Sequence, residues 1–172
     1  MGIIAAETKS NFKPVPEGLH PAVCGDVVDL DLVETDYGTK HKVKIVWQLD
    51  AINPATSKPY LVSCRYTLSL HEKAKLRQHL ETWRGRKFTR EELKGFDLEK
   101  LINANCQVQI IHEPGEDGRI WANVKAVIPQ SKHAPTLRVI DYVREKDRQV
   151  KKVEESDEGL ASDGVDEEPV PF

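Results

Sequence analysis

Apolar residues alternate with polar ones along the first third of the chain in a way that predicts three β-strands. The first is expected over residues 20–32, where Gly25 interrupts the apolar positions as a bulge or bend would. The second is expected over residues 41–49, where the strict alternation predicts one buried and one exposed face. The third follows a polar loop at residues 53–59 and is expected over residues 60–68. The second strand would bury Val43, Ile45, Trp47 and Leu49 and expose Lys42, Lys44 and Gln48.

The middle of the chain changes to a helical period. Leu76, Leu80 and Trp83 are spaced by four and three residues, which places them on one face of a helix that Gly85 would end. A capping box begins a helix with a hydroxyl residue followed three positions later by Glu. Capping signals of this kind occur at Ser69 with Glu72 and at Thr89 with Glu92, and Asp97 is expected to cap a further short turn.

The order of the expected elements predicts the fold class. Two more strands are expected over residues 106–112 and 120–128, joined by an acidic, glycine-containing hairpin loop. Three strands, a helical insert and two strands follow the order of a five-stranded Greek-key OB barrel. A ferredoxin-like α+β fold would place a helix after the first strand, where the pattern shows none. We therefore expect a mainly β protein, an OB-fold-like barrel with a helix between strands 3 and 4.

The segments outside this barrel differ from it in composition. Residues 1–17 lack periodicity and contain the Pro14 and Pro16 pair, so an extended N-terminal arm is expected. Residues 18–130 would form the barrel domain. Residues 131–152 form a basic segment, for which a helix is one interpretation, and residues 153–172 have the composition of a disordered acidic tail.

The charge of the chain is divided unevenly between the body and the tail. The formal net charge is −3, but residues 151–172 hold eight acids against two lysines, which leaves the rest of the chain at +3. A basic body with an acidic tail indicates an anionic ligand and a tail that competes for the same surface. No stretch has the ~20 apolar residues of a membrane helix and no secretory signal is present, so a cytoplasmic location is expected.

The chain lacks the sequence motifs of common catalytic and metal centres. It has no phosphate-binding loop, nucleophile elbow or zinc-protease motif. The three cysteines are far apart in apolar stretches, so we expect buried small side chains rather than zinc ligands. Asp26, Asp29 and Asp31 lie close together along the first strand, but no neighbouring residue suggests metal geometry. We expect a binding protein without cofactor or metal rather than an enzyme.

A row of lysines lies where an OB barrel contacts its ligand, the face of strands 2 and 3. Lys40, Lys42 and Lys44 project from one side of the second strand, about 6–7 Å apart, which approximates the stride of a sugar-phosphate backbone. A solvated strand face that resists aggregation would be rich in lysine for a different reason. The acidic tail favours the ligand-binding interpretation.

Aromatic side chains on the same surface would serve as platforms for bases. Trp121 shares a face with Asn123 and Lys125 and is the strongest candidate, with Tyr37 in a loop as the second. Trp47 and Trp83 fit core packing better.

A second basic group, residues 84–87, follows the predicted helix. It would contact phosphate, or it would only place cations at a helix C-terminus. The candidate nucleic-acid-binding residues are Tyr37, Lys40, Lys42, Lys44, Arg65, Arg84, Arg86, Lys87, Trp121 and Lys125.

The last seven residues resemble the C-terminal tip of bacterial single-stranded DNA-binding proteins. An acidic run precedes an aliphatic residue, proline and a terminal phenylalanine, and such a tip can place its ring in an apolar pocket with a basic rim. With the expected barrel and the segment at residues 88–102, the chain resembles a phage-encoded single-stranded DNA-binding protein. It lacks the N-terminal strand signature and the Gly/Gln-rich linker of the bacterial proteins. The tip consists of Asp166, Glu167, Glu168, Pro169, Val170, Pro171 and Phe172.

This resemblance implies a function in phage DNA replication or recombination, in the cytoplasm of the host. The barrel would cover single-stranded DNA without reading its sequence, with homo-oligomers as one mode of assembly. The tip would compete with DNA and recruit replication or recombination proteins. The main alternative is an OB-fold adaptor or inhibitor that binds a host replication or defence protein, and a third is a metal-dependent nuclease.

Overall fold

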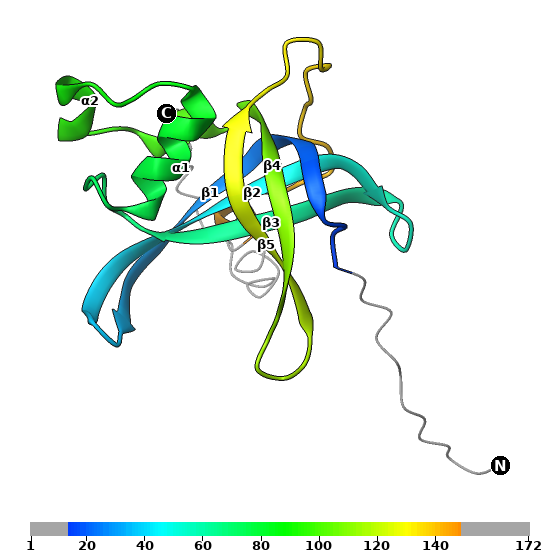
Figure 1. The fold of residues 1–172 in the computed structure, drawn as a ribbon, viewed down its shortest axis with the longest axis horizontal. Helices are drawn as coiled ribbons and strands as arrows, with labels where there is room; N and C mark the ends of the chain where they lie inside the picture. Colours follow the sequence, from blue (N-terminus) through cyan, green and yellow to red (C-terminus); the bar gives the residue numbers. More distant parts are fainter. Residues whose placement is uncertain (1–13, 149–172) are drawn as a thin grey trace, which may run out of the picture.

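The computed structural model describes residues 14–148 and shows one antiparallel sheet of five strands (Figure 1). The sheet order is β3-β2-β1-β4-β5, and the helical insert lies between β3 and β4 in the chain. The expected fold class is confirmed, a mainly β, OB-like architecture, although the sheet does not close into a barrel. The strands are β1 (Gly18–Thr35), β2 (Gly38–Asn53), β3 (Lys58–Thr67), β4 (Asn105–Pro114) and β5 (Ile120–Pro129).

The long strand β1 lets the sheet curl, because it pairs with β2 along most of its length and with β4 at its start. Its register with β2 shifts between Cys24 and Asp26, which is the bulge predicted at Gly25. The edge strands β3 and β5 contact each other, although no hydrogen-bonded ladder joins them in the described part of the chain. The two edges are therefore close together but are not hydrogen-bonded, and the sheet has a gap in its backbone pairing there.

The core fills the inside of the curled sheet. The alternation in β2 is confirmed, since the side chains of Val43, Ile45, Trp47 and Leu49 are all buried. Trp47 packs against Trp83 of the helix, with 5.9 Å between ring centroids. Two of the cysteines, Cys24 and Cys106, are also fully buried, as expected, and Cys64 is half-buried against the core.

The insert contains α1 (Lys75–Arg84), α2 (Arg90–Lys94) and the 3-10 helix η1 (Leu98–Leu101). The first packs Leu76, Leu80 and Trp83 against β3 and β5 and ends at Gly85, whose φ is 72°. The capping box of Thr89 and Glu92 and the Asp97 cap are confirmed by their hydrogen bonds.

The capping box expected at Ser69 is wrong. The hydroxyl of Ser69 accepts the N–H of His71, two residues on, and so closes a local turn instead of a helix. Helix α1 begins at Lys75 after Ala74, which gives no side-chain cap. Burial of the apolar face against the sheet therefore sets where this helix begins.

After β5 the chain turns back, and residues 137–148, here called the strap, lie across the outer face of the sheet (Figure 1). Val23, Val46 and Gln48 are buried although they belong to this outer face, because the strap covers them. A helix was one interpretation of the basic segment at residues 131–152. In its described part, this segment is helical only at residues 145–148. Expectations for residues 1–13 and for the acidic tail fall outside the described residues.

No helix among residues 14–148 has the length and apolar character needed to cross a lipid bilayer.

Candidate nucleic-acid interface

The gap between β3 and β5 forms a groove of about 590 Å³, and the N-terminal half of α1 lines one end of it. Three elements each contribute one basic side chain. Arg65 comes from β3, Lys75 from α1 and Lys125 from β5. Lys125 projects from a bulge, since Gln109 and Ile110 of β4 pair with the residues on either side of it. The structure thus brings together two predicted site residues, Arg65 and Lys125, and adds Lys75, which the sequence prediction omitted.

The charge of the groove is positive at neutral pH. Among the described residues that line it, Glu113 is the one acid, and its carboxylate accepts a hydrogen bond from Asn123 (3.1 Å). His79 is neutral there, because burial and the nearby Lys75 lower its pKa to about 4. A hydrogen bond of 2.7 Å joins Nδ1 of His79 to the buried Tyr66 hydroxyl. The lining can attract anions and donate hydrogen bonds to them.

Trp121 lies on β5 beside this groove. It projects outward with Asn123 and Lys125, as the alternation predicted, and half of its side chain is exposed. The indole packs against the backbone of Gly115 in the β4–β5 loop, where an added Cβ would collide with the indole nitrogen. Glycine at this position therefore permits the close approach of the indole, while about half of the Trp121 side chain stays exposed to solvent.

The predicted lysine row has three different surroundings. Lys40 is exposed, and Lys42 donates to the hydroxyl of Thr67 on β3 (2.7 Å). Lys44 lies opposite Arg65 in the register and pairs with Glu145 of the strap, with 2.7 Å between Nζ and the carboxylate. The row lies on one face as predicted, but only its outer end is open to solvent.

Tyr37 lies at the turn of the β1–β2 hairpin, which projects away from the rest of the sheet (Figure 1). Its side chain is 91% exposed. The structure therefore does not bring Tyr37 together with the groove residues.

The basic group at residues 84–87 is divided between two roles. The guanidinium of Arg84 pairs with Glu92 and lies over the rings of Phe88 and Phe96, at 4.7 and 5.5 Å from their centroids. Its side chain is only 13% exposed, so it joins α1 to α2 rather than facing solvent. Arg86 and Lys87 are exposed and remain candidates for phosphate contact.

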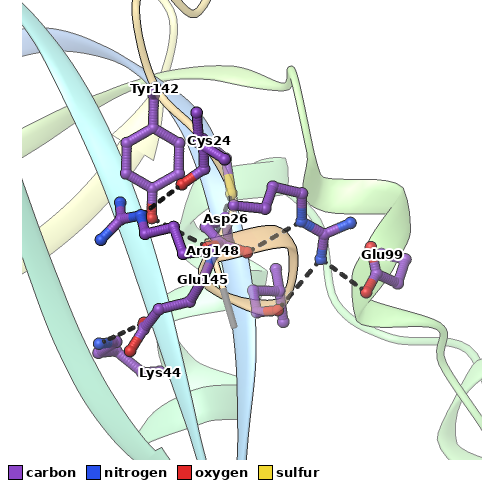
Figure 2. Close-up of polar contacts among 10 residues, drawn as sticks. Cys24, Asp26, Lys44, Glu99, Tyr142, Glu145 and Arg148 are labelled. Carbon is purple, nitrogen blue, oxygen red and sulfur yellow. Dashed lines mark hydrogen bonds and ion pairs between the residues drawn. The ribbon is translucent and has the colours of Figure 1, made fainter. Parts of the chain in front are cut away.

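A polar cluster beneath the strap was missed by sequence reasoning (Figure 2). Asp26 is 1% exposed and accepts hydrogen bonds from the Tyr142 hydroxyl (2.9 Å), Nε of Arg144 (3.0 Å) and the N–H of Glu145 (2.9 Å). Burial alone would raise the pKa of Asp26, but these three hydrogen bonds and the Arg144 charge outweigh it and lower the pKa. The signal in the sequence that could have revealed this cluster was Asp26 itself, an acid within an otherwise apolar part of β1.

Two amide side chains hold the first half of the strap as a neighbouring strand would. Gln48 donates to the carbonyl of Ile140 (2.6 Å) and accepts its N–H (2.7 Å). Asn105 makes the same pair of bonds with Leu137, at 3.1 and 2.7 Å. Val139 and Tyr142 of the strap pack over Gly25.

Asp29, Asp31 and His41 gather on the β1–β2 hairpin, with their ligand atoms within 4.8 Å of one another. The sequence placed no partner beside the two acids, because His41 comes from the opposite strand. Its Nε2 donates to Asp29 at 2.6 Å, and this bond lowers the pKa of Asp29. The donor types would suit a divalent cation, but the exposed imidazole is already engaged with a carboxylate.

No protein-family model matches the chain, and no curated protein matches it.

Proposed function

We propose that the protein binds single-stranded DNA without reading its sequence. The observation that carries the proposal is the groove between β3 and β5, where Arg65, Lys75 and Lys125 converge from three elements beside the exposed Trp121. Cations that pair with phosphates give sequence-independent affinity, and an aromatic ring stacks on any base. The protein would act in phage DNA replication or recombination, in the host cytoplasm, by binding rather than by catalysis.

The tip at residues 166–172 lies outside the described residues, and its role rests on sequence and charge. We propose that it competes with DNA for basic side chains of the body and recruits replication or recombination proteins when DNA displaces it. A linked competitor acts at a high effective concentration, so even a weak tail contact would matter.

The test is fluorescence anisotropy of a labelled oligo-dT and a matched duplex over a salt series. We expect preference for the single strand, with a log–log salt slope of about 0.7 for each neutralised phosphate.

Trp121→Ala should raise Kd for oligo-dT by roughly 5- to 150-fold, which corresponds to the loss of about 1–3 kcal/mol of stacking. Ile120→Ala is the matched control, because it removes another half-exposed apolar side chain of β5. Failure of the full chain to bind oligo-dT at low salt would refute the proposal.

A second candidate function is that of an adaptor or inhibitor that binds a host replication or defence protein. The exposed apolar side chains of the β1–β2 hairpin favour it, since Leu32 is 70% exposed and Tyr37 is 91% exposed. Replacing both with serine should leave oligo-dT binding unchanged if DNA is the ligand of the groove. The same variant should lose its protein partner in a binding assay if the hairpin is the interface.

A further inference from the structure

The ion pair between Lys44 and Glu145 covers part of the expected ligand face. Nζ of Lys44 lies 2.7 Å from the carboxylate, and the two side chains are 19% and 35% exposed. A carboxylate at this distance gives an ammonium group the same charge-assisted hydrogen bond that a phosphate oxygen would give. Glu145 therefore makes with Lys44 the kind of contact that a phosphate group would make (Figure 2).

The surface beneath the strap is continuous with the groove. Arg65 lies opposite Lys44 in the β2–β3 register and also lines the groove. Ser63, the next outward residue on β3, lines both the groove and the depression next to Tyr142 and Glu145. Single-stranded DNA that leaves the groove across β3 would therefore meet Lys44 next.

The two halves of the strap are held by different kinds of contact. Leu137 and Ile140 are held by neutral amide pairs from the sheet. The end of the strap is held mainly through charged groups, with Glu145 on Lys44 and Arg144 on Asp26 and Glu99. Salt and polyanions weaken the partly exposed pair of Lys44 and Glu145, whereas they affect the buried pair of Arg144 and Asp26 and the neutral amide pairs much less.

A left-handed residue separates these halves. Asp141 has a φ of 50°, a conformation that is uncommon for a residue with a side chain. Its neighbours belong to different anchors, since Ile140 is held by Gln48 and Tyr142 by Asp26. Rotation at Asp141 would move the end of the strap without breaking the amide pairs.

We propose that Lys44 and Arg65 form a second phosphate-binding surface, which Glu145 covers in the free protein. Single-stranded DNA that extends from the groove replaces Glu145 at Lys44, and residues 142–148 swing away about Asp141. This inference rests on the proposed single-strand binding. It adds that the protein must release an internal anion before its outer face contacts DNA.

The affinity test compares two neutralising changes on the strap. Glu145→Gln frees Lys44 and should lower Kd for an oligo-dT long enough to leave the groove by about 2- to 5-fold, the range for an exposed ion pair. Asp147→Asn removes the same charge from an exposed acid two residues away and should have a smaller effect. With Lys44→Gln in the background, Glu145→Gln should give no gain. Equal effects of the two strap variants would overturn the inference.

Amide hydrogen exchange supplies a readout that does not depend on affinity. The N–H of Glu145 is bonded to Asp26 and that of Leu137 to Asn105, so they report on the two halves separately. Saturating oligo-dT should speed exchange at Glu145 and leave Leu137 protected. Binding of oligo-dT with no change at Glu145 would show a fixed cover and overturn this inference alone. Absence of any binding to the full chain at low salt would overturn the proposed function as well.

Discussion

Three basic residues that are close in sequence have different surroundings in the fold. Arg84 is paired and mostly buried, whereas Arg86 and Lys87 are exposed. Arg84→Ala should lower the free energy of unfolding by about 1–3 kcal/mol, because it removes the cover of two aromatic rings and leaves Glu92 without its partner. It should not change Kd for oligo-dT beyond its effect on stability. Urea denaturation and anisotropy measure the two quantities.

Lys87→Ala is the matched control, since this exposed residue follows the same helix end. Its effect on the free energy of unfolding should stay within about 0.5 kcal/mol. If Arg84→Ala unfolded like the natural chain but bound DNA weakly, Arg84 would be a ligand contact and its structural role would be wrong.

Single-residue burial could be predicted where it follows from alternation along one element. Trp47 and Trp83 are buried and Trp121 is half-exposed, as their positions on strand or helix faces indicated. The surroundings of Arg84 and Lys44 could not be predicted, because their partners come from other elements. Charge in a sequence identifies a side chain that can bind an anion, but the fold decides whether a carboxylate already holds it.

At the scale of elements, periodicity predicted all five strands and the helix that packs on them. It placed strand ends short of those observed, because backbone pairing continues into polar residues at the ends of β1 and β2. The strap was not predicted, since it has no period of its own. Its shape comes from side chains of β1, β2 and β4, among them Asp26, Gln48 and Asn105.

The anchoring of the strap should depend on pH through Asp26. Its pKa is lower in the folded protein than in the unfolded chain, so its ionised form stabilises the fold at neutral pH. This contribution is fully present above the ordinary carboxyl pKa of about 4 and is lost as the pH falls through the lower folded value. Urea unfolding followed from pH 7 to pH 2 should show this loss in acid.

Asp26→Asn should remove that part of the pH dependence and lower the free energy of unfolding at pH 7 by about 3 kcal/mol. This is near the lower end of the range for a broken buried ion pair, because Arg144 would still pair with Glu99. Asp31→Asn on the same strand changes an exposed carboxylate and provides the control. An unchanged pH profile in the Asp26 variant would mean that other carboxylates cause the acid loss.

At the scale of the whole molecule, the order of elements was enough to predict the topology, because OB-like sheets have few alternatives with a helix between the third and fourth strands. The location of the candidate interface could be predicted only in part. The sequence pointed to the face of β2 and β3, and the structure adds the gap between β3 and β5. That gap depends on how far the sheet curls, which no local pattern encodes.

Two shortened chains test whether the strap completes the fold. A chain that ends at residue 148 keeps the whole strap and is the reference for the comparison. A chain that ends at residue 136 should lose about 3 kcal/mol or more, because it uncovers Val23 and Val46, each buried to more than nine-tenths. Chemical denaturation followed by tryptophan fluorescence measures the difference, and equal stability of the two chains would contradict a structural role for the strap.

The position of the strap also imposes an order of events during protein synthesis. Its partners on the sheet were made much earlier, since Glu145 follows Asp26 by 119 residues. All five strands therefore leave the ribosome before the segment that covers them, and contacts so distant in sequence form slowly. During that interval Lys44 has no Glu145 to hold it. The growing chain thus exposes Lys44, which we propose binds phosphate, before the strap can cover it, and docking of the strap would then limit capture of the ribosome's own RNA.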